Sequence, residues 1–155
     1  MSIEDALRTL LLADAPLMTL ATGGVYSYDD LGQRGFVPKN PVCATAFVTV
    51  NTLITVRPSI IIRDRSETTN NQRFDTISRE TSTQGVVEFW MYVSGRHATL
   101  ETLSVAVWKV LHGKIFPTVG QLFNQQQLKG IYAPEFDNVS LRREDYSYKR
   151  LKRIT

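Results

Sequence analysis

The sequence predicts an α+β fold in which helices pack on a mostly antiparallel sheet. Two kinds of pattern predict it. In two stretches apolar residues recur every three or four positions, as in helices. In other stretches apolar and polar residues alternate, as in strands. The elements follow in the order helix, strands, long hairpin, helix, strands, which is typical of this layer architecture. We expect the 155 residues to form a single domain spanning residues 1–155, long enough to bury a real core.

The first segment is predicted to be a helix. Ser2 suits its N-terminal cap, and Glu4 and Asp5 follow in the first turn, where the helix dipole favours anions. One apolar face is expected from Ile3, Leu7, Leu10 and Leu11. A short helical turn over 16–21 and a short strand at 25–26 should follow.

Residues 27–53 are predicted to be a loop or arm with little secondary structure. Glycines, prolines and the Asp29-Asp30 pair punctuate the stretch and exclude a long helix. A connection of this length in a compact domain is usually functional. The next stretch, residues 54–63, alternates as one strand, in which Pro58 indicates an edge position or a bulge.

Residues 64–84 are polar and contain only Phe74 and Ile77 as large apolar residues. We therefore predict a projecting hairpin loop that does not order by itself. The strand that follows, residues 85–94, is nearly as apolar on its second face (Val86, Trp90 and Tyr92 with Glu88) as on its first (Val87, Phe89, Met91 and Val93). Such a strand needs cover on both sides, and one cover is expected to be another subunit.

The longer helix is predicted at about 97–112, where apolar residues recur at helical spacing up to Gly113. A short helical turn is expected within 119–128, and closing strands at 130–132 and 146–154. The Lys and Arg residues gather at this end. Residues 141–155 hold six basic and two acidic residues, whereas residues 1–50 hold three basic and five acidic residues. This basic end is interpreted as a solvated edge strand or a protein-contact surface, with phosphate binding as the alternative.

Residues that could carry out catalysis are scarce in this sequence. His97 and His112 flank one helix, too far apart to share a metal, and Cys43 lies in a small-residue context typical of a buried thiol. The acidic pairs Asp29-Asp30 and Glu144-Asp145 are expected to be solvated. We expect no enzyme, cofactor or metal site. No apolar run reaches the ~20 residues that span a bilayer, and the acidic start is unlike a secretion signal.

Four stretches of the sequence form a pattern together: the N-terminal IEDALRTLLLADAPL before GGVYSY, the proline-bearing LITVRPSIIIRDR, the strand-then-helix unit GVVEFWMYVSGRHATLETLSVAVWKVLHG, and the closing EFDNVSLRREDYSYKRLKRIT. In these stretches the chain resembles the tail-terminator or tail-completion proteins of long-tailed bacteriophages. The likeness covers most of the chain except residues 64–84. The same features fit the neighbouring head–tail joining proteins equally well.

The resemblance implies a structural virion protein, made in the host cytoplasm, that forms a homo-oligomeric ring of about six subunits at the head-proximal end of the tail. Its partners would be the tail-tube protein and the head–tail connector, with genomic DNA passing through the lumen and no membrane. Head completion and a nucleic-acid-binding module that uses the basic C-terminus stay as alternatives. The contact residues predicted with this interpretation are Arg65, Arg73, Phe74, Arg79, Trp90, Tyr92, Arg142, Arg143, Lys149 and Arg150.

Overall fold

The computed structural model describes residues 2–70, 80–116, 119–132, 136 and 138–153. The helices are α1 (Ile3–Leu12), α2 (Ala15–Leu20), α3 (Tyr28–Leu31) and α4 (His97–Leu111), with 3₁₀ turns at Gly32–Arg34 and Ala44–Ala46. The strands are β1 (Gly24–Ser27), β2 (Phe47–Val50), β3 (Leu53–Val56), β4 (Ser59–Asn70), β5 (Glu80–Ser94), β6 (Ile115–Phe116), β7 (Gly120–Tyr132) and β8 (Val139–Arg153).

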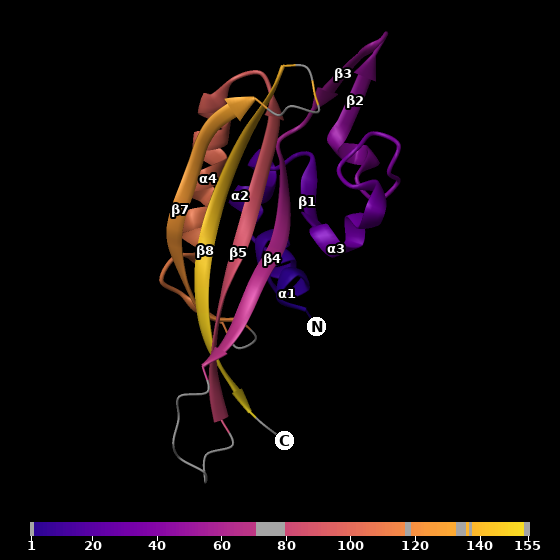
Figure 1. The fold of residues 1–155 in the computed structure, drawn as a ribbon. Helices are drawn as coiled ribbons and strands as arrows, with labels where there is room; N and C mark the ends of the chain where they lie inside the picture. Colours follow the sequence, from indigo (N-terminus) through magenta and orange to yellow (C-terminus); the bar gives the residue numbers. More distant parts are fainter. Residues whose placement is uncertain (1, 71–79, 117–118, 133–135, 137, 154–155) are drawn as a thin grey trace.

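The main sheet of the described residues runs in the order β1-β4-β5-β8-β7-β6, and β2 pairs with β3 apart from it (Figure 1). Among the strands that the structure describes, β1 and β4 pair in parallel and all other pairs are antiparallel. The predicted α+β class with a mostly antiparallel sheet is therefore confirmed.

The centre of the sheet is built from β5 and β8, which pair along their full length from Glu80 opposite Arg153 to Ser94 opposite Val139. At about 3.3 Å per residue, 15 residues extend roughly 50 Å, far beyond the usual strand. The lower ends of β4, β5 and β8 project past the helices in Figure 1. As far as Lys149, β8 lies between β5 and β7, so the predicted placement of the basic C-terminal strand at an edge is wrong for most of β8. From Arg150 to Arg153 the strand pairs with β5.

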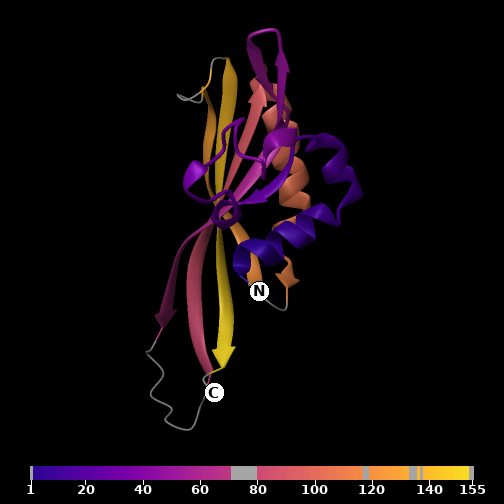
Figure 2. The same cartoon turned by 90° about the vertical axis from the view of Figure 1, so that its right-hand side faces the viewer.

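Helices α1, α2 and α4 lie on one side of the sheet, which we call the inner face (Figure 2). The apolar residues of α1 and α4 sit there against the alternating side chains of β4, β5 and β8. The largest fully buried members of this core are Leu7, Leu11, Leu17, Ile60, Ile62, Phe89, Met91, Leu100, Leu103, Leu111, Tyr146 and Tyr148. The predicted inner faces of α1, α4 and β5 are all confirmed.

Helix α1 is fixed at its start by two polar side chains. Ser2 Oγ accepts a hydrogen bond from the Asp5 backbone N–H at 3.1 Å, which is the predicted N-terminal cap. The Glu4 carboxylate accepts from Ser27 Oγ at 2.7 Å and from the Asp64 N–H at 3.1 Å. Glu4 thus ties the helix to β1 and β4, a role beyond the helix-dipole contact that its position suggests.

The opposite, outer face carries a second buried cluster. Ile61, Tyr92 and Leu141 project from the sheet and pack against residues of the 27–56 segment. Residues 27–53 of that segment were predicted to be a loop or arm with little secondary structure, but the segment contains α3, two 3₁₀ turns and β2, and it buries Leu31, Cys43 and Ala46. It therefore covers part of the outer face, where we expected another subunit.

Burial raises the pKa of the Cys43 thiol, which is 0% exposed. The thiol is thus held in its less reactive, protonated form, in agreement with the predicted small buried residue.

Three local differences from the sequence prediction have clear causes. The strand expected at 54–63 divides into β3 and β4 between Val56 and Ser59. There the Arg57 N–H donates a hydrogen bond to the Ala46 carbonyl, and the Pro58 carbonyl accepts one from the Gly23 N–H. The polar segment 64–84 is paired as far as Asn70 and from Glu80 onward, so the hairpin holds more strand than predicted. The helical turn expected within 119–128 is instead part of β7, which pairs with β8.

A pH-dependent loss of stability is expected from Tyr146. Burial, with a further contribution from Glu144, holds the pKa of its phenol far above the ordinary value of 10.0. The unfolded chain releases this proton near pH 10 while the folded chain keeps it. Stability should therefore fall above pH 10, by up to ~1.4 kcal/mol per pH unit for this group.

Urea unfolding of the wild type and Tyr146→Phe between pH 8 and pH 11 measures this contribution. The other tyrosines contribute equally to both proteins, so the difference in slope belongs to Tyr146. Equal slopes above pH 10 would contradict the burial of this phenol.

Candidate functional site

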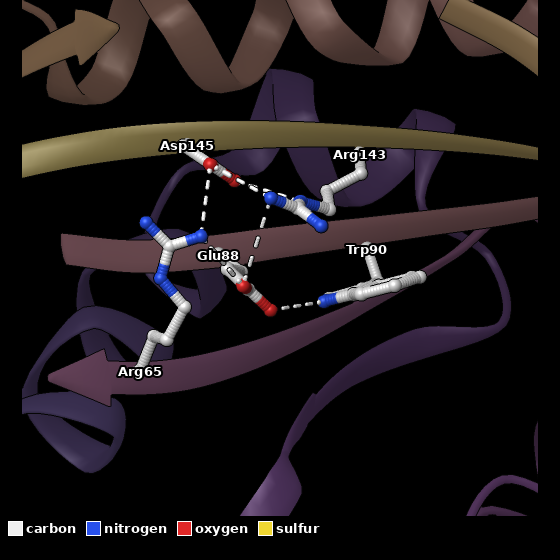
Figure 3. Close-up of polar contacts among 5 residues, drawn as sticks. All are labelled: Arg65, Glu88, Trp90, Arg143 and Asp145. Atoms are coloured by element: carbon white, nitrogen blue, oxygen red, sulfur yellow. Dashed lines mark hydrogen bonds and ion pairs between the residues drawn. The ribbon is translucent and has the colours of Figure 1, made fainter. Parts of the chain in front are cut away.

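A cluster of four charged side chains and one indole lies on the outer face of the sheet. Arg65 comes from β4, Glu88 and Trp90 from β5, and Arg143 and Asp145 from β8 (Figure 3). Strand register explains the gathering, because Glu88 lies opposite Asp145 and Trp90 lies opposite Arg143. Arg65 occupies the β4 bulge between Asp64 and Ser66. We call these five residues the charge cluster.

Each carboxylate of the charge cluster is shared by both guanidinium groups. Arg143 binds Asp145 through Nε at 2.9 Å and Nη2 at 3.0 Å, a two-point contact of the strong kind. Arg65 Nη1 lies 3.3 Å from Glu88 Oε1 and 3.5 Å from Asp145 Oδ2. Arg143 Nη2 also lies 3.8 Å from Glu88 Oε1. Trp90 completes the arrangement by donating its indole N–H to Glu88 Oε2 at 2.9 Å.

The burial of the two acids decides what the charge cluster does. Glu88 and Asp145 are 3% and 2% exposed, whereas the Arg65 and Arg143 side chains are 43% and 25% exposed. Arginines thus cap two desolvated carboxylates, and the four formal charges cancel. The hydrogen bond to Asp145 raises the pKa of Arg143 further. This arrangement holds β4, β5 and β8 together and presents arginine and tryptophan to the outside.

Three of the predicted contact residues, Arg65, Trp90 and Arg143, come together in the charge cluster. Tyr92 is 8% exposed and belongs to the neighbouring apolar cluster on the same face. Lys149 is exposed opposite Gln84, further along β8. The predicted contacts Arg73, Phe74 and Arg79, with the side chain of Arg150, lie outside the described residues.

Arg142 lies on the inner face, away from the other predicted contacts. It is 6% exposed, and its Nη2 lies 3.3 Å from Glu144 Oε1, which also accepts from Ser104 Oγ of α4 at 2.5 Å. The expectation that Glu144 and Asp145 are solvated is therefore wrong. Their side chains alternate to opposite faces of β8, and partners from other elements compensate each of them.

The sequence prediction missed Glu88 and Asp145 as members of the site. One signal for Glu88 was available, since a carboxylate within the apolar run of residues 86–93 must be desolvated and needs a cation. For Asp145 the sequence offers a nearby cation, Arg143, but its second partner is Arg65, 80 positions away along the chain, so its place between two strands had no local signal.

No metal centre forms from the residues in the described ranges: nowhere do three His, Cys, Asp or Glu side chains gather to hold an ion. His97 and His112 lie at the two ends of α4, as predicted. None of the described helices has the length and apolar character needed to cross a membrane.

The fold resembles that of one chain in a solved structure described as "Virion of native gene transfer agent (GTA) particle". The TM-score is 0.63 at 15% sequence identity, and the match covers 97% of this chain and 96% of that chain. At this identity the likeness shows a shared fold. No protein-family model and no curated protein matches the sequence.

Proposed function

We propose that the protein is a structural, non-enzymatic component of a virion that ends a phage tail tube as a ring and joins it to the head connector. The observation that carries the proposal is the fold match over almost the full length of both chains with a virion chain. The sequence resemblance to tail terminators supports the same role. In this role the protein sits at the head-proximal end of the tail, with tail-tube and connector proteins as partners.

Ring closure requires a contact between two different surfaces of neighbouring copies. The β2–β3 hairpin offers one such surface. It stands apart from the main sheet in Figure 1, residues 47–56 carry no charge, and three large apolar side chains are bare: Val50 is 60% exposed, Leu53 61% and Ile54 41%. We assign this apolar tip to the contact between ring subunits, because exposed apolar side chains gathered on a projecting element mark interaction sites.

The proposed mechanism of termination is steric. The ring occupies the growing end of the tube with a surface that accepts no further tube subunit. The nucleic-acid alternative receives less support, since Arg142 and Arg143 of the basic strand are committed to Glu144 and Asp145.

Mass measurement of the purified protein, alone and with tail-tube protein, tests the ring. A ring of about six subunits is expected at least in the mixture. Combined replacement of Val50, Leu53 and Ile54 by threonine should leave a folded monomer. Each aliphatic side chain that is fully buried in the contact between ring subunits stabilises that contact by about 1.5–3 kcal/mol, and the variant loses this contribution at three positions. The matched control is Leu12→Gln on α1, where Leu12 is 40% exposed. Monomer in both wild-type samples would overturn the proposal.

A further inference from the structure

An apolar pocket of about 340 Å³ opens on the outer face beside the charge cluster. Its floor comes from Ile61, Trp90 and Tyr92 of β4 and β5, and its wall from α3 and the turn after it, including Tyr28 and Phe36. Figure 1 shows α3 beside β1 and β4, which places this wall against the sheet. We call this cavity the aromatic pocket. Two of the contact residues predicted from sequence, Trp90 and Tyr92, line it.

The charged residues lining the aromatic pocket, among the described residues, are Arg34 and Arg63. Both are exposed, and within the part of the chain that the structure describes neither makes an ion pair. Arg63 Cζ lies 4.6 Å from the centre of the Tyr28 ring, so this guanidinium is held at the pocket mouth. Asp29 and Asp30 of α3 lie nearby but do not line the cavity. The pocket therefore joins an apolar interior to a cationic rim.

Four of the aromatic rings that line the pocket, those of Tyr28, Phe36, Trp90 and Tyr92, each have a neighbouring group packed against them. Phe36 packs against Tyr92 at 5.0 Å and against Phe47 at 4.7 Å between ring centres. Arg63 covers Tyr28, and Arg143 lies 5.5 Å from the centre of the Trp90 ring. Binding of single-stranded nucleic acid depends on open faces on which bases stack. A cavity of about 340 Å³, in which neighbours already pack against these rings, suits one inserted side chain better than a row of stacked bases.

We infer that the aromatic pocket binds an acidic segment of a partner protein by taking up one of its apolar side chains. The apolar side chain fills the cavity as an anchor, and carboxylates beside it pair with Arg34 and Arg63. Charge complementarity selects this partner, because the rim offers two cations without an ion pair and the described residues of the lining include no acid. The inference goes beyond the proposed function, and it holds whatever the subunit count of the ring.

Fluorescence anisotropy with the full chain tests the inference. The probe is a labelled peptide, acetyl-Asp-Glu-Phe-Leu-Asp-Glu-amide, and two further peptides replace either Phe-Leu by Ser-Ser or the four acids by lysine. We expect binding of the first peptide only. Combined Arg34→Gln and Arg63→Gln should weaken it at least tenfold, whereas Arg96→Gln, at an exposed arginine outside the pocket, should leave it unchanged.

Three results would overturn the inference. The first is no binding of the acidic peptide at millimolar protein. The second is equal weakening by Arg96→Gln, which would show that only net charge matters. The third is tighter binding of a labelled oligothymidine that is likewise lost in the Arg34/Arg63 variant, which would assign the pocket to nucleic acid. Wild-type and variant circular dichroism must agree, so that loss of binding reports the pocket.

Discussion

Replacement of Asp145 by asparagine is expected to lower the free energy of unfolding by about 3 kcal/mol. The carboxylate is 2% exposed and receives two hydrogen bonds from Arg143. Removal of one partner from a buried ion pair typically costs 3–5 kcal/mol, because the other charge is left without compensation. The lower end of this range applies here since the Arg143 side chain is 25% exposed.

Urea unfolding measures this loss of unfolding free energy, which is compared with the losses in two further variants. Arg65→Gln should cost only about 1 kcal/mol, because that side chain is 43% exposed and exposed ion pairs contribute little. The double variant with leucine at 143 and 145 should be less destabilised than the sum of the single leucine variants, since no charge is stranded. A loss below 1 kcal/mol for Asp145→Asn would contradict the burial of the charge cluster.

The second large effect is expected from Phe89→Ala. Phe89 is fully buried at the centre of the inner face and meets Tyr146 edge to face, with ring centres 5.1 Å apart. Truncation of a buried phenylalanine usually costs 3–5 kcal/mol, because the lost apolar contact leaves a cavity. The midpoint of urea unfolding should fall accordingly.

Phe123→Ala on β7 is the matched control. Phe123 is 42% exposed, so its truncation should cost less than about 1 kcal/mol. A loss for Phe89→Ala no larger than that for Phe123→Ala would contradict the placement of β5 beneath the helices.

The elements set by local pattern were predictable from the sequence. The capping Ser2, the apolar spacing of α1 and α4, and the two apolar faces of β5 all follow from neighbouring residues, and the structure confirms each. Hydrophobic periodicity reports such elements because one face of each must be buried.

The features set by distant residues were not predictable. β8 was expected at an edge because it is basic, but its position depends on pairing with both β5 and β7. Glu144 and Asp145 were expected in solvent because adjacent acids usually are, but Ser104, Arg65 and neighbouring arginines of β8 compensate them. The glutamine-rich residues of β7 have no clear period, so only the ladder with β8 defines them as a strand.

The site shows the same division. Arg65, Trp90 and Arg143 were predicted as contact residues from their type and position, and their role in contacts stays a prediction. The acids that hold them together emerged only from strand register. The arm predicted at residues 27–53 was expected to serve contacts with partners. It instead covers part of the outer face and forms one wall of the aromatic pocket, while its β2–β3 tip stays exposed.

Growth of tail tubes in the presence of this protein tests the central proposal most directly. Tail-tube protein is polymerised with and without the purified chain, and tube lengths and ends are recorded by electron microscopy. Termination predicts shorter tubes that carry one added ring at an end and do not extend when fresh tube protein is supplied. The threonine variant of the β2–β3 tip should leave growth unchanged. Tubes that carry an added ring but still extend, or tube lengths that the wild-type protein leaves unchanged, would contradict the proposed function.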